Sequence, residues 1–161
     1  MQAKRICCFG GEVADKKQTL ERIEKLLKSL SEKEEVLLLL EGKTPFMNLC
    51  RKAAEKLGLR RIEYQREGDC LFRFKKHGKK SGKSLRIDGQ GELQRLFRKG
   101  RVFVELADIC IFYCFGEYLS FDRRNTEESR TQTALRYAYF LKGQGKNLTI
   151  INMERKEKDL Q

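Results

Sequence analysis

Two adjacent carboxylates, followed closely by a cation and a hydroxyl, form the first cluster that could perform chemistry. Glu127 and Glu128 precede a segment with helical spacing, and Arg130 and Thr131 come next. A carboxylate can serve as the acid or the nucleophile when a glycosidic bond is cleaved. Arginine and a helix N-terminus can hold a phosphate group. The alternative is that both glutamates only stabilise the positive N-terminal end of a helix.

A second cluster follows two other apolar segments. Gly10 and Gly11 come directly after KRICCF, and Gly42, Lys43 and Thr44 come after VLLLLE. Glycine lets a ligand phosphate approach the backbone closely, and Lys43 would add a cation. In the simpler interpretation the glycines only form turns and Thr44 only caps the next helix. Neither the Gly10-Gly11 pair nor the single Gly42 belongs to a GxGxxG or Walker motif.

Alternating strands and helices must position these clusters. Continuous apolar runs predict buried parallel strands over residues 4–9, 36–40, 61–64, 109–115 and 148–152. Apolar residues at three- and four-residue spacings and capping signals predict helices over 16–30, 45–57, 92–99 and 130–142. We therefore expect an α/β fold, a three-layer α/β/α sandwich around a Rossmann-like parallel sheet of about five strands.

In such a sheet the ligand lies at the carboxyl ends of the strands. Gly116 opens a long polar loop, residues 116–130, which falls in that place. We expect residues 1–152 to form a single domain, with a basic loop insert at 65–91, a loop or a short hairpin, and a charged tail at 153–161.

The net charge of +12 is uneven, because residues 60–101, which include the basic insert, hold 14 Lys/Arg against 5 Asp/Glu. Phe72 and Phe74 alternate with cations there, a combination typical of surfaces that bind single-stranded nucleic acid. Two other interpretations remain open: a lid over an anionic nucleotide, and a loop that is only solvated. The candidate nucleic-acid-binding residues are Lys75, Lys76, Lys79 and Lys80.

The six cysteines and the single histidine, His77, lack the close pairing typical of zinc ligands. We expect buried, reduced thiols, no metal and no cofactor. No apolar run approaches the ~18 residues that a membrane span needs, and no signal peptide precedes the first strand. We therefore expect a cytoplasmic protein with no membrane partner.

The overall layout resembles the SLOG superfamily of Rossmann-like domains, which includes the lysine-decarboxylase-like phosphoribohydrolases and the DNA-processing protein A fold. Gly10-Gly11, Gly42, Ala107-Asp108 and Thr131 match positions of its motifs, whereas Glu41 replaces a glycine and no PGGxGT occurs. The resemblance implies a domain that binds a nucleotide or nucleotide-derived small molecule at the carboxyl ends of its strands. Related proteins often dimerise, and the apolar helix faces here are compatible with a homodimer.

The segment TQTALRYAYFLKGQGK is also similar to nucleoside 2-deoxyribosyltransferases, in which a glutamate attacks the sugar. That glutamate falls on Ala134 in this chain. An N-glycoside hydrolase or transferase acting on nucleosides or nucleotides is therefore an alternative function that requires Glu127 or Glu128 as its acid. A nucleic-acid-binding module that uses the basic insert is a further alternative.

Overall fold

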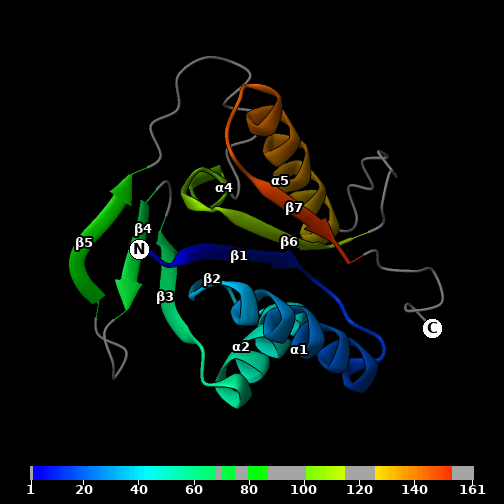
Figure 1. The fold of residues 1–161 in the computed structure, drawn as a ribbon. Helices are drawn as coiled ribbons and strands as arrows, with labels where there is room; N and C mark the ends of the chain where they lie inside the picture. Colours follow the sequence, from blue (N-terminus) through cyan, green and yellow to red (C-terminus); the bar gives the residue numbers. More distant parts are fainter. Residues whose placement is uncertain (1, 68–69, 75–79, 87–100, 115–125, 154–161) are drawn as a thin grey trace.

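The strands in the described part of the chain form one mixed sheet of seven strands in the order β5-β4-β3-β2-β1-β6-β7 (Figure 1). The computed structural model describes the backbone of residues 2–67, 70–74, 80–86, 101–114 and 126–153, and the side chains of 2–64, 102–114 and 130–153. The strands are β1 (Lys4–Gly10), β2 (Val36–Glu41), β3 (Arg60–Glu67), β4 (Cys70–Phe74), β5 (Lys80–Arg86), β6 (Ile109–Tyr113) and β7 (Thr149–Asn152).

Five neighbouring strands, β3, β2, β1, β6 and β7, run parallel, which confirms the expected Rossmann-like sheet. From β1 the chain adds β2 and β3 on one side, and then returns to add β6 and β7 on the other. This reversal makes a topological switch point between β1 and β6, the place where open α/β sheets bind ligands.

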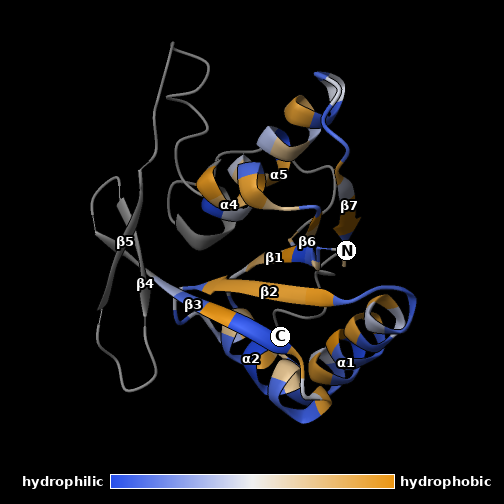
Figure 2. Ribbon diagram, turned by 60° about the vertical axis from the view of Figure 1, so that its left-hand side comes forward, coloured by the Kyte–Doolittle hydropathy of each residue, from blue (hydrophilic) through white to orange (hydrophobic). Residues whose placement is uncertain are grey.

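Helices cover both faces of the parallel strands. α1 (Lys16–Lys33) and α2 (Pro45–Leu57) pack on one face, and α4 (Arg101–Leu106) and α5 (Thr126–Gly143) on the other (Figure 1). Neighbouring residues of β1 divide between the two cores, because Cys8 packs with α1 and α2 whereas Cys7 packs with α4 and α5. Burial on both faces explains why β2 is apolar almost throughout its length (Figure 2).

The predicted signals for the second helix are confirmed. Thr44 is the N-cap of α2, Pro45 occupies its first turn, and Gly58 ends it in the left-handed conformation with φ 66°. α1 begins in a similar way, since the Asp15 carboxylate accepts from the Gln18 N–H at 3.0 Å. Local chemistry therefore fixes where both helices begin at the same edge of the sheet.

The basic loop insert predicted for 65–91 is not confirmed. Within that segment the described backbone completes β3 and forms the β4–β5 hairpin, which continues the sheet in antiparallel fashion. Lys75, Lys76, Lys79 and His77 lie outside the described residues, and Lys80 begins β5.

Two predicted boundaries also differ. α5 begins at Thr126, before the predicted start at Arg130, so the polar loop is shorter than expected. Met153 is buried and donates its N–H to the Phe112 carbonyl at 2.7 Å, so it belongs to the domain and not to a tail. The helix expected over 92–99 lies outside the described residues, whereas residues 101–106 are helical. Within the described ranges, no helix combines the length and apolarity needed to cross a membrane.

Candidate functional site

The carboxyl ends of β1, β2 and β6 lie at one side of the sheet, here called the carboxyl edge. α1 and α2 begin there because each follows one of these strands, and α5 begins there because it returns the chain to the start of parallel β7 (Figure 1). The structure therefore brings Gly10, Gly11, Gly42, Lys43 and Thr44 to one edge, as predicted. Gly116 lies outside the described residues.

The absence of a side chain at Gly10 is explained by packing. A Cβ atom at this position would lie 2.5 Å from Cδ2 and 2.6 Å from Cγ of Phe46. The Phe46 ring in turn stacks on Tyr113, with centroids 4.9 Å apart and planes inclined by 3°. Both aromatic residues are fully buried. The close approach that Gly10 permits on this face is therefore to Phe46 and not to a ligand.

The first-turn amides of α2 are already engaged. The first helical residue is a proline and has no N–H, and the Phe46 N–H donates to the Gly11 carbonyl at 3.0 Å. The Met47 N–H donates to Thr44 Oγ1 at 3.2 Å, and that hydroxyl donates to the Gly10 carbonyl at 2.6 Å. An anion bound beside this helix must therefore be held by other groups, above all by side chains.

Lysines gather at the helix N-termini of the carboxyl edge. Lys16 and Lys17 are exposed in the first turn of α1, Lys43 is exposed just before α2, and neither first turn contains an acidic residue. A cation opposes the helix dipole at this end, so helix stability does not explain these lysines. They place three exposed ammonium groups where an anion can contact them.

Around the ends of β1 and β2, three carboxylates of the described residues share the carboxyl edge with these lysines. Asp15 is used as the N-cap of α1, and Glu12 is exposed. Glu41 is half-buried as the last residue of β2, and Gly42, with φ 88°, turns the chain directly after it. Dinucleotide-binding folds use a carboxylate that follows the first βα unit to accept hydrogen bonds from ribose hydroxyls. The sequence did contain a signal for Glu41, an acid that ends an apolar strand just before Gly-Lys. Comparison of this segment with a glycine motif obscured that signal.

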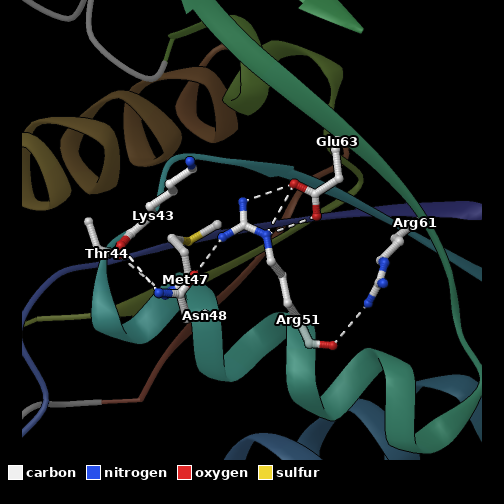
Figure 3. A network of polar contacts seen from close by, with 7 residues as sticks. All are labelled: Lys43, Thr44, Met47, Asn48, Arg51, Arg61 and Glu63. Atoms are coloured by element: carbon white, nitrogen blue, oxygen red, sulfur yellow. Dashed lines mark hydrogen bonds and ion pairs between the residues drawn. The ribbon is translucent and has the colours of Figure 1, made fainter. Parts of the chain in front are cut away.

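A polar network fixes the flank of α2 against β3 (Figure 3). The Arg51 guanidinium donates to both carboxylate oxygens of Glu63, from Nε at 2.9 and 3.1 Å and from Nη2 at 2.9 Å. Arg51 also donates to Asn48 Oδ1 at 3.0 Å, and the Asn48 side chain donates to the Lys43 carbonyl at 3.3 Å. The network thus reaches the backbone of Lys43, and no described acid forms an ion pair with the Lys43 ammonium group.

The residues predicted on the last helix are spread over two turns of α5. Glu127 and Glu128 lie in its first turn, where carboxylates stabilise the helix dipole, and Arg130 is exposed. Thr131 is the sixth residue of α5 and so lies in the second turn, not at the helix start. It is 4% exposed and therefore faces the core. Ala134, the position of the transferase glutamate, is also buried in the core beneath α5.

Ala107-Asp108 lies at the opposite edge of the sheet. Asp108 Oδ2 accepts from the Arg5 N–H at 2.9 Å, and the Asp108 N–H donates to the Arg5 carbonyl at the same distance. The Asp108 carbonyl accepts from the Thr149 N–H at 3.0 Å. Asp108 therefore joins the amino ends of β1, β6 and β7, and this pair of residues has a structural role.

The described cysteines are buried, free thiols. Burial raises the pKa of Cys110 to about 12 and raises those of Cys7 and Cys50 well above their usual range. Such thiols remain protonated at neutral pH and are poor nucleophiles and metal ligands. Among the residues that the structure describes, no group of three or more His, Cys, Asp or Glu side chains could hold a metal ion.

Comparison of the chain with protein-family models, with curated proteins and with solved structures finds no match. The SLOG-like resemblance of the motifs therefore stays a prediction.

Proposed function

We propose that this protein binds a nucleotide or a nucleotide-derived small molecule at the carboxyl edge, around the ends of β1, β2 and β6. The observation that carries the proposal is the strand order, because it makes a switch point between β1 and β6. The lysines at the N-termini of α1 and α2 support an anionic ligand.

Glu41 and Lys43, which flank Gly42, have specific roles in the proposed site. Lys43 contacts a phosphate group of the ligand, because its ammonium group is exposed and its backbone is held by Asn48. Glu41 accepts hydrogen bonds from the ribose hydroxyls, because it ends β2 at the position that suits this contact. The ligand class that satisfies both residues contains a ribose and a phosphate within a few ångströms of each other, as a nucleotide does.

Titration calorimetry with nucleoside mono- and diphosphates and with the matching nucleosides tests this assignment. Lys43→Gln should weaken nucleotide binding about tenfold or more, since a charge-assisted contact is lost, and should leave nucleoside binding unchanged. Glu41→Gln should weaken both ligand types. Lys28→Gln, an exposed lysine in the body of α1, is the matched control and should bind like the wild type. Absence of heat with every nucleotide would contradict the proposal.

A further inference from the structure

The sheet extends beyond the layers of helices at its β5 end. β4 pairs with β3 and β5 pairs with β4, both in antiparallel fashion. In Figure 1 these two strands lie to one side of α1 and α2, and the main packing contacts of the described helices are with other elements. The hairpin therefore offers sheet surface that the described helices do not cover.

Backbone alternation identifies the residues on the α2 side of this surface. Glu63 lies on that side, because its carboxylate meets Arg51 of α2. Gln65 is two positions further along β3 and therefore shares the face, and its partner on β4 is Phe72. Phe74 follows Phe72 by two positions, so both phenylalanines occupy the α2 side of the sheet.

The same alternation places cations beside these aromatic positions. Lys80 is the partner of Phe74 on β5, after a register shift in the ladder. Arg86 is the partner of Cys70, which is two positions before Phe72 and so lies on the same face. The hairpin thus carries aromatic and basic residue types together on one side.

The neighbouring strand β3 adds a further cation to this side. Arg61 is exposed and donates from Nη1 to the Arg51 carbonyl at 3.1 Å, so its position beside α2 is fixed (Figure 3). This face of β3 has two acids, and the charge of Glu63 is balanced by Arg51. Glu67 is then the one remaining acid of β3 on this face, opposite the three cations Arg61, Lys80 and Arg86. The positions therefore have a net positive charge that complements an anionic chain.

We propose that this face, defined by Arg61, Phe72, Phe74, Lys80 and Arg86, binds single-stranded nucleic acid. The two phenylalanine positions are about 6.6 Å apart along the strand, so successive bases of an extended chain can stack on them. The three cations then contact the phosphates on either side. This surface is built from β3, β4 and β5, whereas the proposed nucleotide site uses the ends of β1, β2 and β6, and its binding does not depend on nucleotide binding there.

Fluorescence anisotropy of the full chain with a labelled 15-nucleotide single strand, measured at several salt concentrations, tests the proposal. Phe72→Ala/Phe74→Ala should raise Kd about tenfold or more, whereas Phe72→Tyr/Phe74→Tyr should retain binding because tyrosine also stacks. Lys80→Gln/Arg86→Gln should lower the slope of log K against log salt by about 1.4. The charge-matched control, Lys28→Gln/Lys142→Gln, removes two exposed lysines of α1 and α5 and should leave the Kd threefold or less from the wild type.

Circular dichroism must show that each variant is folded, and the tyrosine variant remains informative if the alanine variant unfolds. Equal affinity of the wild type for a polyglutamate chain of matched length would overturn the proposal, because it would show binding by charge alone. The proposal would also be overturned if the tyrosine variant lost binding or if the Kd did not depend on salt. The same holds if the control variant bound as weakly as Lys80→Gln/Arg86→Gln.

Discussion

Thr44 joins two neighbouring strands at the carboxyl edge, because its hydroxyl donates to the Gly10 carbonyl at 2.6 Å while it accepts from the Met47 N–H. One side chain thus caps α2 and ties the loop after β2 to the end of β1. The bond from the Phe46 N–H to the Gly11 carbonyl is a second tie at the same place. Lys43 directly precedes this anchored residue, so its backbone position is well determined.

Thr44→Val removes both hydrogen bonds while nearly preserving the shape of the side chain. We expect the free energy of unfolding to fall by about 1–3 kcal/mol, because a helix cap and a partly buried hydrogen bond are lost together. Urea denaturation followed by circular dichroism measures this change. Thr44→Ser keeps the hydroxyl and should be clearly more stable than the valine variant. Equal stability of the valine variant and the wild type would show that the tie is energetically unimportant.

Gly10→Ala places a methyl group against the ring of Phe46. We expect a loss of about 1–3 kcal/mol in the free energy of unfolding, since overpacking forces the ring or the backbone to move. Phe46→Leu provides the partner for a double-mutant cycle, and the coupling between the two sites should be at least about 0.5 kcal/mol. Strictly additive losses would mean that the alanine is accommodated elsewhere.

Local signals and periodicity predicted the parallel strands and the helices that cover them. The start of α2 is the clearest case, because Thr44, Pro45 and Gly58 act on the backbone through their own chemistry and need no distant partner. The reason for Gly10 could not be predicted in this way. It depends on Phe46, which is 36 positions away in the sequence, and on the packing of that ring against Tyr113.

The errors have physical causes of the same kind. Charged residues and glycines between 65 and 91 suggested a loop or a short hairpin, and in the structure part of this segment is a hairpin that continues the sheet beside β3, which local signals do not predict. Thr131 was expected in the first turn of a helix that starts at Arg130, yet the helix continues back to Thr126 and Thr131 faces the core. Glu41 was not considered a candidate from the sequence, because comparison with a glycine motif obscured an acid that ends an apolar strand.

Arg51→Lys keeps the charge opposite Glu63 but loses the paired donors of the guanidinium group. The two side chains are only 22% and 33% exposed, so we expect a loss of about 0.5–1.5 kcal/mol in the free energy of unfolding. The more exposed pair of Lys56 with Glu24 is the control, and Lys56→Gln should cost about 0.5 kcal/mol or less. Urea denaturation compares the two variants, because urea, unlike guanidinium chloride, does not screen charges. Similar losses at both pairs would contradict a special role for Arg51.

Because of the buried thiols, the free energy of unfolding should decrease at alkaline pH. The pKa of Cys110 is about 12 in the folded protein, against about 8.5 in an unfolded chain, so the unfolded state loses its proton first as the pH rises. Stability is therefore full below about pH 8.5 and falls between there and pH 12, by up to about 1.4 kcal/mol per pH unit for each such thiol. Urea denaturation from pH 7 to 10.5 measures the slope, and Cys110→Ala should make it shallower. An unchanged slope would contradict the assignment to Cys110.

The most direct test of the carboxyl-edge site is a heteronuclear NMR titration of labelled protein with nucleoside monophosphates and with the matching nucleosides. We predict saturable shifts at the amides of Gly42, Lys43 and Thr44, with larger shifts for the phosphates than for the nucleosides. The amide signals of Ala107 and Asp108, at the opposite edge, should not shift. No shift with any nucleotide, or shifts confined to the amino ends of the strands, would contradict a nucleotide site at the carboxyl edge.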